Sequence, residues 1–151
     1  MRKDARDSVF KLLFSNLFND DYDDVLKLEI FTADKLTKQD VEFAEQLLSL
    51  IKQNKSEILG EIENISNGYK IERIYPTDKV ALMIAFCEMK YISSIPLIVS
   101  INESMELVRK YSTEESPNFV NGVLAEYKKR LEENLWFYLT EKNFQLNIEN
   151  S

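Results

Sequence analysis

The chain of 151 residues contains no histidine and a single cysteine, Cys87. Without histidine, neither a Ser-His nor a Cys-His catalytic pair can be built, and a zinc site loses its usual nitrogen ligand. One cysteine cannot form a disulfide within the chain. Because Cys87 ends an apolar run, we expect a buried, unreactive thiol. These absences predict a protein that is not an enzyme and uses no cofactor or metal.

Glycine and proline are also scarce, with three of each. Three scattered glycines cannot build a P-loop or a dinucleotide-binding fingerprint, and they leave little material for β-hairpin turns. Hydrophobic residues make up 44% of the chain and charged residues 30%, which is typical of a soluble globular domain. The composition therefore predicts a single all-helical domain.

Long apolar runs are missing as well. None approaches the roughly 18 residues that a membrane span requires, and the N-terminus does not resemble a signal peptide. We therefore expect a cytoplasmic protein with no membrane contact. The net charge of −7 argues against broad, charge-driven nucleic-acid binding, which needs many contacts from lysine and arginine to phosphate. It leaves room for a small basic patch or for an interface with a basic protein.

Apolar residues spaced three and four apart predict the helices of the first half. We expect helices over about 4–18 and 23–31, and a third and longest helix that begins with a cap at Thr37–Asp40 and bends at Gly60. For this third helix, we favour one helix across a core over a dimeric coiled coil. The predicted buried stripe of the first helix comprises Phe10, Leu13, Phe14 and Leu17, with Val9 and Phe18 alongside.

The sequence of the second half predicts one turn or loop followed by three more helices. Residues 69–75 alternate weakly, and Pro76–Asp78 then begins a helix whose run Val80–Cys87 is apolar on every side and should lie at the centre. Ser94–Pro96 and Ser116–Pro117 have the serine and proline that begin helices. The buried face of the first of these two helices is predicted to comprise Ile98, Ile101, Met105 and Val108.

Two features near the C-terminus, Gly122 and the aromatic tail, lead to further predictions. A glycine within a helix, Gly122, costs roughly 1 kcal/mol relative to alanine, so we expect close approach of another backbone or a ligand there. We divide the chain into a helical domain, 1–134, and an aromatic tail, 135–151. The tail's cluster Leu135–Leu139 either packs on the domain or offers an apolar patch to a partner, and we favour packing.

Three blocks of the sequence resemble the NusB family of transcription antitermination factors. The longest, residues 101–124, reads INESMELVRKYSTEESPNFVNGVL. The other two are IERIYPTDKVALMIAFCEMKY at 71–91 and ARDSVFKLLF at 5–14. The resemblance covers most of 2–127 and none of the tail. It implies the NusB-like fold, in which two small helical bundles with about seven helices pack together.

The resemblance also implies a function. Members of this bacterial family bind the boxA element of ribosomal RNA transcripts as a heterodimer with NusE, a small-subunit ribosomal protein. The complex joins RNA polymerase with NusA and NusG, helps it read through terminators, and catalyses no reaction. Two alternatives stay open: a protein-interaction module with weak or no RNA binding, and a detached relative of the NusB-like domain of ribosomal RNA methyltransferases. A homodimer and a monomer both occur in the family.

Carried over residue by residue, the resemblance predicts an RNA surface. A basic arm of Arg2, Lys3 and Arg6 would neutralise phosphate. Phe119 would stack on an unpaired base, and Glu115 would accept a hydrogen bond from a base amino group. The second block adds Glu72, Asp78 and Lys79. From the residues alone, other roles remain open: Phe119 in the core, Glu115 at a helix N-terminus, and Asn102 and Asn121 as bridges between helices.

Overall fold

The protein is described here by a computed structural model of residues 2–16, 23–66 and 70–149, with side chains described as far as Leu135. Throughout these ranges the regular structure is helical, as predicted from composition and apolar spacing. Six α-helices and one turn of 3-10 helix follow one another: α1 (Arg2–Ser15), α2 (Asp24–Ala33), α3 (Lys38–Ile65), η1 (Ile71–Arg73), α4 (Pro76–Tyr91), α5 (Leu97–Tyr111) and α6 (Ser116–Glu149).

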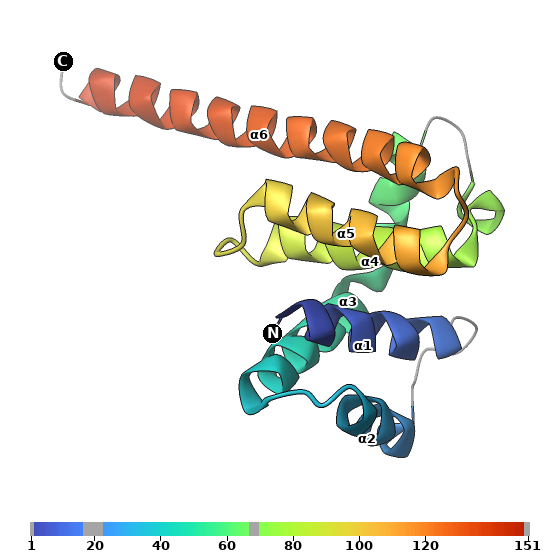
Figure 1. Ribbon diagram of the computed structural model, residues 1–151. Coiled ribbons are helices and arrows are strands. Elements are labelled where there is room, and N and C mark those ends of the chain that lie inside the picture. Colours follow the sequence, from blue (N-terminus) through green and yellow to red (C-terminus); the bar gives the residue numbers. More distant parts are fainter. Residues whose placement is uncertain (1, 17–22, 67–69, 150–151) are drawn as a thin grey trace.

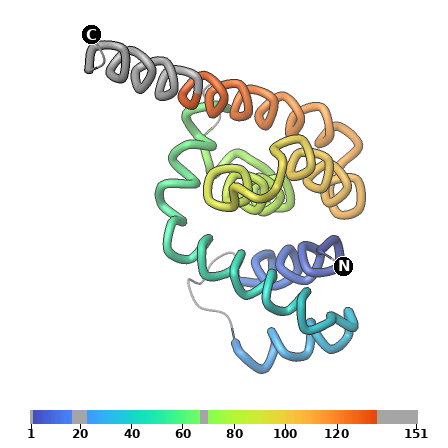
Figure 2. Tube along the Cα trace, turned by 90° about the vertical axis from the view of Figure 1, so that its left-hand side faces the viewer, coloured from blue at the N-terminus to red at the C-terminus, as the bar shows by residue number. Residues whose placement is uncertain are grey.

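The helices form two bundles that share α3. Helix α1 packs with both α2 and α3, whereas α4, α5 and α6 pack with one another on the other side and α4 also packs with α3 (Figure 1). Helix α3 runs from the first bundle to the second, as the view turned by 90° shows (Figure 2). Helix α1 also contacts α4 and α5, so it lies at the boundary between the bundles. The predicted NusB-like arrangement of two small bundles is therefore present.

Helix α1 buries only part of the predicted stripe: Phe10 and Val9 are buried and Leu13 packs against the core partly buried, but Phe14 is not buried. Ala5, Val9 and Leu12 are buried, whereas Phe14 is 44% exposed and stacks on Phe10 with 6.2 Å between ring centroids. The prediction for Phe14 was wrong because α1 turns its 5-9-12 face toward α3 and α4, and the spacing alone allowed either face. The predicted stripe members Leu17 and Phe18 lie outside the described residues.

Helix α3 begins as predicted but bends elsewhere. The Thr37 hydroxyl accepts the amide of Asp40 at 3.2 Å, and the Asp40 carboxylate accepts the amide of Thr37 at 3.3 Å, which completes a capping box. The kink lies at Asn54, not at Gly60. The side-chain amide of Asn54 donates to the carbonyl of Leu50 at 2.8 Å, and such an insertion bends a helix.

Helix α4 is the central helix, as the sequence predicted. All ten residues from Val80 to Met89 are buried. Burial, reinforced by the negative charge of Glu88, raises the pKa of the Cys87 thiol to about 12, so the thiol stays protonated at neutral pH. Cys87 is therefore the buried, unreactive cysteine that its apolar surroundings in the sequence predicted.

Helices α5 and α6 run antiparallel beside each other (Figure 1). Ile101, Met105 and Val108 are buried as predicted, but Ile98 is 52% exposed in the first turn of α5. At Gly122 an added Cβ would meet no atom within 4 Å, so the expected close approach of another backbone was wrong. The prediction that α3 is the longest helix was also wrong, because α6 has 34 residues and α3 has 28.

Helix α6 continues without a break across residues 134 and 135, where we placed the boundary of the tail. Leu135 is 59% exposed. The side chains of residues 136–139 lie outside the described part, so packing of the aromatic cluster stays a prediction. Among the described helices, none combines the length and hydropathy needed to cross a membrane.

Candidate nucleic-acid interface

Arg6, predicted to belong to the basic arm, lies inside the protein and is only 4% exposed. Its guanidinium donates two hydrogen bonds to the Glu88 carboxylate, at 2.7 and 2.8 Å, and lies 5.2 Å from the centre of the Phe43 ring. Ser100 also donates to Glu88, at 3.1 Å. Arg6 thus joins α1 to α3, α4 and α5 and is not on the surface with its neighbours, so we leave it out of the proposed RNA surface.

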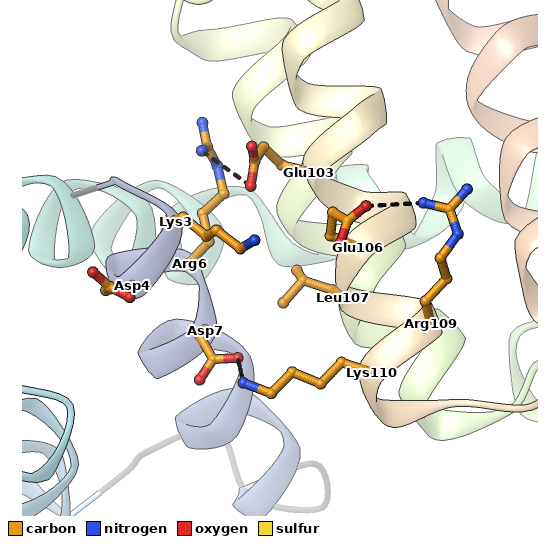
Figure 3. Close-up of a pocket in the computed structure, with 9 residues that line it drawn as sticks. All are labelled: Lys3, Asp4, Arg6, Asp7, Glu103, Glu106, Leu107, Arg109 and Lys110. Atoms are coloured by element: carbon orange, nitrogen blue, oxygen red, sulfur yellow. Dashed lines mark hydrogen bonds and ion pairs between the residues drawn. The ribbon is translucent and has the colours of Figure 1, made fainter.

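The other two members of the arm face different sides of α1. The guanidinium of Arg2 lies 4.8 Å from the centre of the Phe43 ring, beside the start of α3. Lys3 lines a groove between α1 and α5 (Figure 3). Both side chains are exposed, and among the described residues no acid pairs with Lys3. The exposed part of the arm is therefore two residues, not three.

The groove beside Lys3 has a volume of about 420 Å³ and carries mixed charge (Figure 3). Arg109 pairs with Glu106 at 3.0 Å, and Lys110 pairs with Asp7 at 3.0 Å. Four basic and four acidic side chains line it in all, together with Leu107: Lys3, Arg6, Arg109, Lys110, Asp4, Asp7, Glu103 and Glu106. Because the charges balance, the groove is not a basic track for a phosphate backbone.

A network of hydroxyl groups fixes the turn between α5 and α6 against the start of α4. The Ser112 hydroxyl donates to the Asp78 carboxylate at 2.5 Å, and it lies 2.7 Å from the hydroxyl of Thr77 and 2.8 Å from that of Ser116. Asp78 is 2% exposed. The prediction that Asp78 helps to form the RNA surface is therefore replaced by a structural role in holding this turn.

Thr113, not Ser116, caps α6. The Thr113 hydroxyl accepts the amide of Ser116 at 3.2 Å, and the Ser116 hydroxyl accepts the amide of Thr113 at 3.3 Å. This is the reciprocal pattern of a capping box, with serine in the position that glutamate usually takes. The cap therefore lies three residues before the predicted one. The Glu115 side chain therefore has no capping role, because the hydroxyl groups of Thr113 and Ser116 already accept each other's backbone amides.

The fixed turn forms one side of a small hollow that is lined by residues from the starts of α4 and α6. Both helices begin at the right of the view in Figure 1. The hollow has a volume of about 90 Å³. Its lining combines aromatic, acidic and basic side chains with hydroxyl groups: Arg73, Ile74, Tyr75, Asp78, Thr113, Glu115, Ser116 and Phe119. The structure thus brings together the two residues, Glu115 and Phe119, that the family motif placed on one surface.

Phe119 could offer a ligand an aromatic face, and Glu115 could offer it a hydrogen-bond acceptor. Phe119 is partly buried and packs against the core while it also lines the hollow, so the core and surface interpretations both apply. Glu115 is exposed, and no described side chain or backbone group bonds to its carboxylate. A carboxylate without a partner beside an aromatic ring can accept hydrogen bonds from a ligand.

The remaining predicted residues lie around the hollow or away from it. Glu72 is exposed on η1 next to Arg73, whereas Lys79 is half-buried on α4; neither lines the hollow. Asn102 and Asn121 are exposed, and neither bridges helices within the described part of the chain. The sequence interpretation missed Tyr75 and Arg73. The only signal for them was their position inside the second family block, just before Pro76, where the resemblance gave neither residue a role.

The two parts of the predicted surface are separate. Lys3 lies near Glu103 of α5 (Figure 3), whereas the hollow lies beyond the end of α5 at Ser112. That separation is about 14 Å along the helix axis. A ligand that touches both must therefore be extended.

The sequence pattern of the NusB family matches residues 3–129. The chain belongs to the NusB family. It is 34% identical over 131 residues to the transcription antitermination protein NusB of Finegoldia magna, covering 87% of this chain and 96% of that protein.

Solved NusB structures have the same fold. T. maritima NusB superposes with a TM-score of 0.78 at 32% identity, covering 85% of this chain and 91% of that one. A second structure contains antitermination factors NusB and NusE in complex with double-stranded RNA; it superposes with a TM-score of 0.76 at 27% identity, covering 85% and 96%. The family match ends at residue 129, so the last part of α6 extends beyond the shared region.

Proposed function

We propose that this NusB-family chain is a transcription antitermination factor. It binds boxA RNA of ribosomal RNA transcripts together with the ribosomal protein NusE. The complex then joins RNA polymerase, with NusA and NusG, and helps it read through terminators. Support comes from the family match over 3–129 and from the related structure that contains both NusE and RNA.

The observation that carries the proposal is the hollow beside the start of α6. Phe119 and Glu115 were assigned to RNA by the family motif and line the same concave surface. An aromatic side chain and an unbonded carboxylate are the groups that read an unpaired base, through stacking and through hydrogen bonds to its edge. Arg2 and Lys3 supply cations for phosphates further along the strand.

The electrostatics indicate that RNA binding by the chain alone is weak. The net charge is −7, the groove beside Lys3 carries balanced charge, and Arg6 is occupied by Glu88. Phosphate binding gains affinity mainly from released counterions, and the two exposed cations of the arm release few. A ribosomal protein bound beside the chain supplies the missing positive charge in our proposal.

The first experiment measures binding of a fluorescently labelled boxA RNA by anisotropy, with and without NusE. We expect weak binding alone and at least several-fold tightening when NusE is present, because two ligands of one complex strengthen each other reciprocally. A scrambled RNA of the same length serves as the control and should not gain from NusE. A transcription assay on a boxA leader followed by a terminator then measures read-through.

The same charge balance supports a second candidate function, a protein-interaction module of NusB fold that binds RNA weakly or not at all. The two candidates differ in one measured quantity. If boxA RNA binds no better with NusE than without it, and no better than the scrambled RNA, the interaction module is correct and antitermination through RNA is not.

A further inference from the structure

Tyr75 is a large aromatic side chain that the fold leaves in solvent. It is 62% exposed, although it lies directly before the most buried helix of the protein. Its side chain makes no capping hydrogen bond to α4, and no ring stacks on it in the described part of the chain. The stability of the fold therefore gives no reason for an aromatic residue at this position.

The backbone holds Tyr75 in a defined place. Its ψ of 136° lies in the range that the following Pro76 favours, and its carbonyl accepts the amide of Lys79 at 2.9 Å in the first turn of α4. The side chain consequently lines the hollow opposite residues of the α5–α6 turn. An exposed aromatic ring on a fixed backbone loses little freedom when a ligand stacks on it.

Arg73 lies two residues before Tyr75 and lines the same hollow. It is exposed at the end of η1, and within the described residues no carboxylate pairs with it. The hollow thus joins a cation and an acid, Arg73 and Glu115, each without a partner, around two aromatic side chains. An unpaired base with its phosphate needs this combination: a stacking face, an acceptor for its amino or imino hydrogens, and a cation.

We infer that Tyr75 is the stacking face of a site for one unpaired nucleobase of single-stranded RNA. In this site Glu115 accepts a hydrogen bond from the base edge and Arg73 neutralises an adjoining phosphate. The inference rests on the proposed RNA-binding function and goes beyond it, because it assigns the base to Tyr75, a residue to which the family resemblance gives no role.

The test compares Tyr75→Ala with Tyr75→Phe in the complex with NusE, using boxA RNA as a single strand and the same sequence as a full duplex. Loss of one stacked base costs roughly 1–3 kcal/mol, so Tyr75→Ala should weaken single-strand binding about 5- to 150-fold. Tyr75→Phe keeps the ring and should bind within about twofold of the unmodified protein. Duplex binding should not change, because its bases are not free to stack.

Two further variants complete the design. Ile98→Ala removes a side chain that is also about half exposed, but at the far end of α5, and should leave RNA binding unchanged. Arg73→Gln should weaken binding and flatten the salt dependence by about 0.7 in the logarithmic slope, as expected when one phosphate of a single strand is no longer neutralised. Thermal melting of each variant checks that the exposed substitutions leave the fold intact.

The outcomes separate this inference from the proposed function. Unchanged single-strand binding by Tyr75→Ala overturns the inference and leaves the function standing. Equal weakening of single strand and duplex also overturns it, because a paired base cannot enter the site. If Tyr75→Ala weakens binding of NusE instead of RNA, the hollow receives a protein side chain and the inference is overturned. If the unmodified complex binds no RNA, the function fails and the inference fails with it.

Discussion

At the scale of single residues, the same residue type has opposite roles in neighbouring positions. Arg2 is exposed, whereas Arg6, one helical turn further on, is enclosed with Glu88. The charge pattern of the sequence could not separate them, because both lie among charged residues in the first two turns of the same helix. The tertiary structure separates them by placing a buried carboxylate opposite only one.

The pair of Arg6 and Glu88 gives the first stability prediction. Arg6→Met leaves a carboxylate buried at 1% exposure without its cation and should cost about 3–5 kcal/mol of unfolding free energy. The double substitution Arg6→Met and Glu88→Met removes both charges and should recover most of that loss, since apolar groups of similar volume often replace a buried pair well. Urea unfolding monitored by circular dichroism measures all three proteins. A double variant less stable than Arg6→Met would contradict this account.

At the scale of helices, α1 is joined to the end of α5 through Asp7. Tyr111 donates to its carboxylate at 2.7 Å and Lys110 at 3.0 Å, and Lys11 pairs with it at 3.1 Å. Burial alone would raise the pKa of Asp7, but the hydrogen bonds from Tyr111, Lys110 and Lys11 outweigh burial and lower it. The contact between these two helices therefore depends on an ionised carboxylate.

This lowered pKa predicts how the α1–α5 contact responds to acid. A carboxylate whose pKa is lower in the folded state stabilises the fold above its unfolded pKa, and this stability is lost as the pH falls through the folded pKa. Asp7→Asn should therefore cost about 1 kcal/mol near neutral pH and progressively less below about pH 4. Urea unfolding at several pH values gives the difference. Glu63→Gln, an exposed change on α3, is the control, and a cost for Asp7→Asn that stays constant with pH would rule out the ionised contact.

At the scale of the whole molecule, a net charge of −7 and two exposed arm residues limit the electrostatic part of RNA binding. Each phosphate contact on a single strand contributes about 0.7 to the slope of log affinity against log salt. The double substitution Arg2→Gln and Lys3→Gln should reduce that slope by about 0.7 for each phosphate that is no longer neutralised, in the complex with NusE. Lys129→Gln is the matched control, because it removes an exposed charge from α6 about 15 Å beyond Phe119 along the helix. An unchanged slope in the double variant would remove the arm from the interface.

The sequence by itself determined the elements and the family. Apolar spacing, the Thr37–Asp40 capping box and the unbroken run in α4 are local signals, because helix formation and capping depend on residues within one or two turns. The family motif likewise placed Phe119 and Glu115 on one surface, and in the structure both residues line the hollow. These features could be predicted because each is encoded by neighbours in the chain.

The tertiary structure alone decided which side chains remain available. The enclosure of Arg6 by Glu88, the use of Asp78 to hold Ser112, and the addition of Tyr75 and Arg73 to the hollow all depend on residues far apart in the sequence. A periodic pattern assigns a residue to a face of its own helix, but the charge and exposure of that residue depend on what the other helices place opposite it.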